Sequence, residues 1–263
     1  MSLLRDFGEK VVVITGGGGG LGRALAQEFS SRKAKVCILD VDVKGLSETK
    51  NLIESKGGKA FTYLCDVSEK AQVFSTFEKI RSEVGPTYCL VNNAARTHLS
   101  PFHKTKVEVL EKIIAINLLG AIYCTRAAIH DIIAQKGIII GISSVCGFAP
   151  VAGRCAYAAS KHGLSGFLST LRTEVAKYGV SVLIVYPSYL RTDLHKNALA
   201  RDMHLIIPEM LEPEEAASKI VRAAEGDQRV LLLGRMAEMA WNLYKEDPEK
   251  YEKIMLEYNI LEE

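Results

Sequence analysis

The feature that most restricts the fold of this chain is a run of five glycines at residues 16–20. Four apolar residues at 11–14 precede the run, which is typical of a buried parallel strand. After it, Leu21, Leu25 and Phe29 recur at helical spacing. Because glycines leave the main chain open, an anion can reach the N–H groups and the positive dipole end of the helix. The sequence therefore predicts a strand, turn and helix that hold the pyrophosphate of a dinucleotide.

Two glycine motifs fit the run, Gly17-x-Gly19-x-x-Gly22 and Thr15-Gly16-x-x-x-Gly20-x-Gly22. The glycine count does not choose between them, and a flexible loop without a ligand is a further interpretation. Asp40 ends a predicted strand at 35–39, about 20 residues past the glycines, where a carboxylate accepts hydrogen bonds from the adenosine ribose. It also repels a 2′-phosphate, so NAD is favoured over NADP. An exposed aspartate at a strand end is the alternative.

Length and composition favour one domain that binds small molecules. A chain of 263 residues with alternating strands and helices is predicted to form a single domain, residues 1–263. The formal net charge of +2 is too small to indicate a nucleic-acid binder, which needs an excess of basic residues. Residues 1–10 do not resemble a signal peptide and no apolar run reaches membrane-spanning length, so we expect a cytoplasmic protein.

The six cysteines are scattered along the chain, several within apolar runs, and are expected to be reduced core residues. Neither they nor the six histidines show the close spacing of metal ligands, so no metal site is predicted.

Strands and helices alternate through most of the chain. The predicted strands cover residues 11–14, 35–39, 59–64, 88–91, 137–142, 180–185 and 229–233, and the predicted helices cover 21–32, 43–56, 69–84, 104–134, 155–178 and 213–225. This order predicts a three-layer α/β fold around a doubly wound parallel sheet. Ligands are expected at the carboxyl ends of its strands.

Two segments depart from the alternation. Residues 188–211 predict a mobile flap over the substrate rather than core, because their apolar residues have no clean period; these are Leu190, Leu194, Leu199, Met203, Leu205, Ile206, Ile207 and Met210. Residues 234–263 predict a C-terminal helical extension with two apolar stripes. The stripes are Met236, Met239, Ala240, Leu243 and Tyr244, and then Tyr251, Ile254, Met255 and Tyr258. We expect them to pack on the chain's own body or a second subunit, rather than on a membrane or as a lid.

Polar and small residues recur at the predicted strand ends and on the helices that follow. They are Asp66-Val67, Asn92-Asn93-Ala94, Asn117, Ser144, Tyr157-x-x-x-Lys161 and Pro187-x-x-x-x-Thr192. With Asp40 and the second glycine motif, in this order, the chain resembles the short-chain dehydrogenase/reductase family, in its compact single-domain branch. The resemblance covers residues 8–233 and implies a Rossmann-type fold and an oxidoreductase that transfers a hydride between NAD(H) and a secondary alcohol or ketone.

By this resemblance, Tyr157 is the general acid and base, and Lys161 lowers its pKa together with the cationic nicotinamide ring. Ser144 orients the substrate oxygen, and Asn117 holds a water that links Lys161 to solvent. A satisfied core amide is the alternative for Asn117. The residues implied to bind the cofactor are Gly16, Gly20, Leu21, Gly22, Asp40, Asp66, Val67, Asn93, Tyr157, Lys161 and Thr192. Ala95 and Ser188 depart from the family, which usually has glycine at both places.

The apolar flap, with Phe148, Pro150 and Val151, predicts a medium or large hydrophobic substrate such as a steroid, retinoid or long-chain carbonyl. The predicted helices at 104–134 and 155–178 have more apolar surface than is required to cover one face of the sheet. By resemblance, we expect a homodimer or homotetramer.

Two other functions remain open. A non-catalytic dinucleotide-binding sensor or scaffold would keep the fold without turnover, but Ser144, Tyr157 and Lys161 are all present. A nucleotide-sugar epimerase or dehydratase is disfavoured, because the chain lacks room for a sizeable sugar-binding region.

Overall fold

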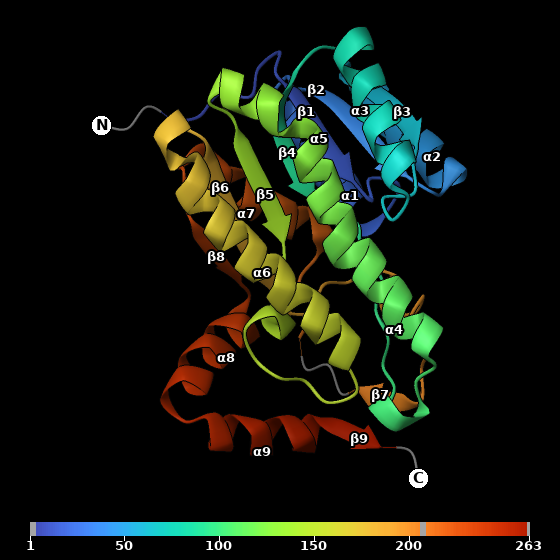
Figure 1. The fold of residues 1–263 in the computed structure, drawn as a ribbon, viewed down its shortest axis with the longest axis vertical. Coiled ribbons are helices and arrows are strands. Elements are labelled where there is room, and N and C mark those ends of the chain that lie inside the picture. The colour runs from blue at the N-terminus through green and yellow to red at the C-terminus, as the bar shows by residue number, and fades with distance from the viewer. Residues whose placement is uncertain (1–3, 206–208, 262–263) are drawn as a thin grey trace.

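A seven-stranded parallel sheet forms the centre of the computed structural model, which describes residues 4–205 and 209–261 (Figure 1). The strand order is β3-β2-β1-β4-β5-β6-β8. These strands are β1 (Val11–Thr15), β2 (Lys35–Asp40), β3 (Lys59–Leu64), β4 (Thr87–Asn92), β5 (Ile138–Ile142), β6 (Ser181–Pro187) and β8 (Val230–Leu233). The order reverses between β1 and β4, so a crevice for ligand opens at their carboxyl ends.

Helices cover both faces of the sheet, which confirms the predicted three-layer α/β fold. Along β1, Val12 and Ile14 enter one core and Val11 and Val13 enter the other, because successive side chains point to opposite faces. The first core is covered by α1 (Gly20–Ser31), α2 (Val43–Glu54) and α7 (Pro213–Glu225). The second is covered by α3 (Lys70–Glu83), α5 (Gly120–Gln135) and α6 (Cys155–Val175).

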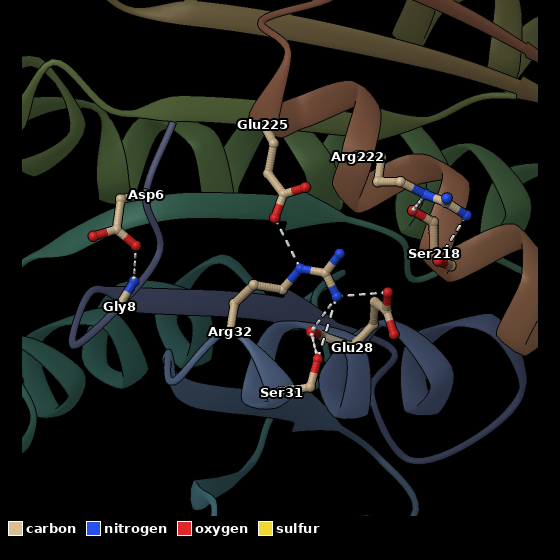
Figure 2. Close-up of polar contacts among 8 residues, drawn as sticks. All are labelled: Asp6, Gly8, Glu28, Ser31, Arg32, Ser218, Arg222 and Glu225. Carbon is tan, nitrogen blue, oxygen red and sulfur yellow. Dashed lines mark hydrogen bonds and ion pairs between the residues drawn. The ribbon is translucent and has the colours of Figure 1, made fainter. Parts of the chain in front are cut away.

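An arginine at the end of α1 fastens this helix to α7 (Figure 2). Arg32 Nε donates to Glu225 Oε1 at 2.8 Å, and Arg32 Nη1 donates to Glu28 Oε1 at 2.6 Å. All three side chains are half-buried, and a shared network of this kind stabilises more than an isolated exposed ion pair. The bonds hold α1, which begins at the glycine turn, against α7.

The helix predicted over 104–134 is interrupted twice. The chain forms a 3₁₀ turn at Phe102–Lys104, then α4 (Val107–Ile114), a π-helical turn at Ala115–Leu119, and α5. The π-helical turn carries Asn117 on its buried side, and the apolar periodicity on both flanks gave no sign of it. The helix predicted over 155–178 is α6 followed by a 3₁₀ turn at Ala176–Tyr178. The other predicted elements differ from the observed ones by about one or two residues, as helix ends commonly do.

The C-terminal extension consists of α8 (Arg235–Glu246), α9 (Pro248–Tyr258) and a short strand, β9 (Asn259–Leu261). Its helices lie beyond the carboxyl end of β5, at the bottom of Figure 1. Strand β9 pairs in antiparallel fashion with β7 (Met203–Leu205), within the predicted flap. The sequence did not predict this pairing, because neither three-residue strand has a period long enough to recognise.

The two apolar stripes pack on the chain's own body over part of their length. Ala240, Tyr251 and Met255 are buried in one cluster with Ala149, whereas Met239 is exposed. The predicted stripe residue Tyr258 and the flap residue Leu205 have side chains outside the described part of the structure. Ile206 and Ile207 lie outside it altogether.

Main-chain hydrogen bonds connect part of the predicted flap to the loop around Thr97 and Leu99. Leu199 N donates to Thr97 O, Leu99 N donates to Ala200 O, and Asp202 N donates to Leu99 O, each at 2.8 Å. Met203 is buried. Main-chain bonds to a distant loop therefore position this segment, which no pattern within residues 188–211 could indicate. Across residues 4–205 and 209–261, no helix is both long and apolar enough to cross a membrane.

Candidate active site

A cavity of about 780 Å³ opens at the carboxyl ends of the strands. Its wall combines the glycine turn, the ends of β2, β4 and β5, the N-terminal half of α6, the flap segment and the extension. Twelve of the predicted site residues line it: Gly16, Gly20, Leu21, Gly22, Asp40, Asp66, Val67, Asn93, Ser144, Tyr157, Lys161 and Thr192. The two departures from the family pattern, Ala95 and Ser188, line it as well.

The geometry of the glycine turn distinguishes the two candidate motifs. Gly16 and Gly20 have φ of +67° and +50°, in the left-handed region that favours glycine. A Cβ added at Gly22 would lie 2.0 Å from Gly16 O. Gly19 has extended backbone, with nothing within 4 Å of an added Cβ. The turn therefore depends on glycine at the positions of the Thr15-Gly16-x-x-x-Gly20-x-Gly22 spacing.

The end of β4 clamps this turn from the neighbouring strand. Thr15 Oγ1 accepts hydrogen bonds from Asn93 N and Ala94 N, both at 3.0 Å. Asn93 Nδ2 donates to Thr15 O at 2.9 Å and to Gly16 O at 3.1 Å. Asn93 thus holds the turn in shape with its amide.

Asp40 lies against the glycine turn at one end of the cavity. Its Oδ2 accepts from Gly18 N at 2.8 Å, and its Oδ1 accepts from Val41 N at 2.7 Å and Asp42 N at 3.1 Å. A carboxylate has about four acceptor positions, so these bonds fix its orientation and leave capacity for a ligand hydroxyl. Asp66 differs, because its Oδ1 accepts from both the amide and the hydroxyl of Ser68.

Ser144, Tyr157 and Lys161 meet at the other end of the cavity. Tyr157 and Lys161 are one turn apart on α6, with Lys161 Nζ 5.7 Å from the centroid of the phenol ring. Lys161 Nζ donates to Ile142 O at 2.7 Å, at the end of β5. Ser144 follows that strand, and its Oγ accepts from Cys146 N at 3.2 Å.

Burial dominates the protonation of both α6 side chains. It raises the pKa of Tyr157 to about 12, against smaller lowering effects of the Arg154 guanidinium and of a hydrogen bond with Ser144. Burial also lowers the pKa of Lys161 to about 8. In the protein without cofactor, the phenol is therefore protonated at neutral pH and can act as a proton donor.

Asn117 makes three hydrogen bonds within the protein. Its Oδ1 accepts from Arg96 N at 2.8 Å, and its Nδ2 donates to Arg96 O at 2.9 Å and to Ser160 Oγ at 3.0 Å. It is not among the described residues that line the cavity. These bonds fit a satisfied core amide, and they tie the loop after β4 to α6, next to Lys161. The amide oxygen keeps a second acceptor position, so the predicted role of Asn117 in holding a water stays a prediction.

The sequence prediction missed Arg154, which immediately precedes α6 and is only 2% exposed. Its Nη1 donates to Thr97 Oγ1 at 2.8 Å, its Nη2 donates to His195 Nδ1 at 3.1 Å, and its Cζ lies 5.6 Å from the Tyr157 ring centroid. No local pattern could have marked it, because its partners come from a distant loop and the flap.

The extension supplies an apolar wall. Met236, Ala240, Tyr251 and Met255 line the cavity. Helix α8 is anchored by Trp241, whose ring packs edge-on against Phe148 at 4.8 Å between centroids. Phe148 lies in the loop after Ser144, so the extension and the loop that carries the candidate catalytic serine are in direct contact. Within the described residues, no group of three or more His, Cys, Asp or Glu side chains could hold a metal ion.

Comparisons with known proteins find a matching family and several similar chains. A family model described as short chain dehydrogenase matches residues 10–202. The chain is 33% identical over 242 residues to the putative oxidoreductase SadH of Mycobacterium tuberculosis, covering 87% of this chain and 88% of that one. It is 28% identical to human estradiol 17-beta-dehydrogenase 11, covering 94% and 82%. A crystal structure of a metagenomic short-chain oxidoreductase in complex with NADP superposes with a TM-score of 0.74 at 29% identity, covering 87% of this chain and 98% of that chain.

Proposed function

The chain belongs to the short-chain dehydrogenase family of oxidoreductases acting on CH–OH groups, and on this premise we propose that it transfers a hydride between NAD(H) and a secondary alcohol or ketone. The observation that carries the proposal is the meeting of Ser144, Tyr157 and Lys161 in one cavity with the glycine turn. A dinucleotide-binding sensor without turnover is the alternative, and it would not need these three side chains together.

The chemistry proposed for the chain's own residues is proton transfer at the substrate oxygen. Bound NAD(H) would supply or accept the hydride. In reduction, Tyr157 gives its phenolic proton to the carbonyl oxygen, and in oxidation it takes the proton of the alcohol. Ser144 donates a hydrogen bond to the same oxygen and orients it. Lys161, held by Ile142 O, keeps a positive charge beside the phenol and stabilises its ionised form.

The residues at the other end of the cavity fit a dinucleotide. The N-cap residue of α1 is Gly19, which has no side chain to cap the helix, and the space in front of it is open, so the first N–H groups of the helix can bind a pyrophosphate. Asp40 would accept the ribose hydroxyls, which favours NAD over NADP. Leu21, Asp66, Val67 and Thr192 are the lining residues proposed to complete the site.

We propose that the substrate has a medium or large apolar body. Two parts of the cavity support this: the methionines and Tyr251 of the extension, and Val151 from the loop after Ser144. One relative is named as an estradiol dehydrogenase, which is consistent with a substrate of this kind. Steroids, retinoids and long-chain carbonyls all present such a body.

A two-part assay tests the function. Titration of NADH and NADPH, followed by the fluorescence of the reduced nicotinamide, measures cofactor binding. Absorbance of the nicotinamide with a panel of alcohols and ketones measures turnover. We expect NADH to bind more tightly than NADPH, and secondary alcohols or ketones with apolar bodies to react. Cofactor binding without turnover on any member of a broad panel would support the sensor instead. Reaction of small charged carbonyls only would contradict the apolar body.

Three further proposals concern the protein as a whole. Residues 8–233 form the cofactor-binding core of one domain, and residues 188–211 and 234–263 cover the substrate. The outer sides of the helices over 104–134 and 155–178 form an interface in a homodimer or homotetramer, and exposed apolar side chains of the first stretch, such as Val107 and Leu119, support this. Sedimentation tests this, because a strict monomer at micromolar concentration would contradict it.

A cytoplasmic location is supported by six free thiols, five of them buried.

A further inference from the structure

Arg154 is a buried cation with no carboxylate partner among the described residues. It is 2% exposed and lines the cavity beside Tyr157. Its two hydrogen-bond acceptors are the hydroxyl of Thr97 and a ring nitrogen of His195. Within the described residues, no acidic side chain lies within ion-pair distance of its guanidinium. A guanidinium has five N–H donors, and a charge buried without a counter-ion is costly.

The neighbours of Arg154 do not supply the missing negative charge. His195 accepts a hydrogen bond from the guanidinium, and burial, followed by the charge of Arg154, lowers the pKa of this histidine to about 4. Tyr157 and Tyr189 are also near, and burial raises the pKa of each to about 12. All three side chains are therefore neutral at physiological pH, so none of them compensates the positive charge of Arg154.

The charges of the cavity are divided between its two ends. Asp40 and Asp42 lie at the glycine turn. Arg23 and Lys44 line the same end, and both pair with Glu48. On the flap, Asp193 pairs with Lys196 at 3.0 Å, both largely exposed. Near the catalytic end, Arg96 and Lys112 line the wall in addition to Arg154 and Lys161. The charged lining residues near the catalytic end are therefore basic, whereas at the place expected for the adenosine ribose acidic side chains are mixed with basic ones.

We propose that Arg154 binds a carboxylate of the substrate, so that the substrate is an oxo- or hydroxy-carboxylate with an apolar body. This inference rests on the proposed function and specifies its substrate class. The guanidinium can hold a carboxylate through two parallel hydrogen bonds. Since Arg154 lies against the Tyr157 ring, the carboxylate is within a few bonds of the carbon that is oxidised or reduced. The rest of the substrate lies on the wall formed by Tyr251 and the methionines of the extension.

Matched substrate pairs test the proposal by kinetics. Each pair is a straight-chain oxo-carboxylate and its methyl ester, with the ketone at different distances from the carboxylate. The wild-type protein should prefer the acid in at least one pair. Arg154→Gln should lower the ratio of kcat/KM for acid over ester by about 100-fold, the loss of a buried charge-assisted pair. Arg154→Lys keeps the charge without the planar fork and should lower the ratio by about tenfold.

Arg222→Gln is the matched control. This arginine lies on the exposed side of α7, where its guanidinium bonds to Ser218 (Figure 2). The same substitution there should leave the acid-to-ester ratio unchanged. A change equal to that of Arg154→Gln would mean that the ratio reports a general loss of positive charge, which would overturn the proposal.

A binding measurement is independent of turnover. Octanoate has the carboxylate and the apolar chain but no ketone, and it can be titrated into the protein with NADH while nicotinamide fluorescence is followed. Saturable binding by the wild type, weakened about 100-fold by Arg154→Gln, supports the proposal. If Arg154→Gln does not fold, as judged by circular dichroism, octanoate binding to the wild type and to Arg154→Lys decides the question.

The outcomes separate this inference from the proposed function. If neutral ketones react and neither oxo-carboxylates nor octanoate are recognised, the inference fails and the proposed function stands. If no carbonyl of either kind reacts, the proposed function fails, and octanoate binding still decides the role of Arg154. If Arg154→Gln lowers acid and ester rates equally and shifts the pH profile, Arg154 acts on Tyr157 instead of the substrate, and the inference fails.

Discussion

The two ends of the cavity are built in different ways. The nucleotide end consists mainly of main chain: a turn without side chains, clamped by Asn93 and flanked by Asp40 at the end of the next strand. The substrate end consists of side chains from separate segments, among them Arg154 before α6, His195 on the flap and Tyr251 in the extension. A cofactor that many proteins share can be bound by the main chain of one kind of turn. Recognition of a particular substrate depends on side chains, which can differ between proteins of the same fold.

The largest expected effect is at Tyr157, in the substrate end of the cavity. Tyr157→Phe removes the proposed proton donor and retains the ring, so turnover should fall by about 10³ to 10⁴-fold. NADH affinity should stay within about threefold, because the nucleotide end is untouched. Steady-state rates and fluorescence titration measure the two effects. Turnover near the wild-type level would exclude Tyr157 as the donor.

The next effect tests the main-chain construction of the nucleotide end. An added Cβ at Gly22 would clash with Gly16 O, whereas at Gly19 it would meet open space. Gly22→Ala should therefore lower the free energy of unfolding by about 3 kcal/mol. Gly19→Ala should change it by less than about 0.5 kcal/mol. Denaturant unfolding without cofactor measures both, and equal values would contradict the asymmetry of the turn.

A smaller effect is expected on cofactor choice. Asp40→Asn removes the charge that would repel a 2′-phosphate, so the preference for NADH over NADPH, measured as a ratio of dissociation constants, should fall by about tenfold. Asp247→Asn is the control, because this residue is not among the described residues that line the cavity, and asparagine serves as well as aspartate at the start of α9, where Asp247 Oδ1 accepts from Lys250 N. An unchanged ratio in Asp40→Asn would show that this carboxylate does not select the cofactor.

The smallest effect concerns the substrate end and depends on pH. His98 is fully buried and its Nε2 accepts from Ala156 N, next to Arg154. Burial, with a further effect of Arg154, lowers the pKa of His98 from 6.5 to about 4. Below about pH 6.5, His98 is protonated in the unfolded chain but stays neutral in the folded protein. The contribution of His98 to the free energy of unfolding is therefore complete above this pH and is lost as the pH falls toward 4.

Between pH 7.5 and 5.5, His98 should cost the wild type about 1 kcal/mol. His98→Gln should remove this part of the acid sensitivity, whereas His103→Gln, at an exposed position, should not. Denaturant unfolding at the two pH values measures the difference. Equal acid sensitivity in wild type and His98→Gln would show that His98 takes up its proton in the folded state.

Much of the fold was readable from local pattern. Apolar runs bounded by glycine and polar residues predicted all seven strands of the main sheet, and helical spacing predicted the helices between them, because each element buries a face whose period is written in its own residues. The interruption at Ala115–Leu119 was not readable, since a π-helical turn keeps the apolar character of its flanks. The pairing of β7 with β9 joins segments more than fifty residues apart, and neither segment carries a signal for the other.

The sequence by itself determined the glycine turn, Asp40 and the spacing of Tyr157 and Lys161, because each depends on residues close together in the chain or on the end of a predicted strand. Only the tertiary structure showed which glycines the geometry of the turn requires, which partners bond Asn117, and that Arg154 reaches the cavity between Thr97 and His195. These contacts join three segments far apart in the sequence. Whether a charged side chain is buried, and which charges lie near it, depends on residues that only the folded chain brings together.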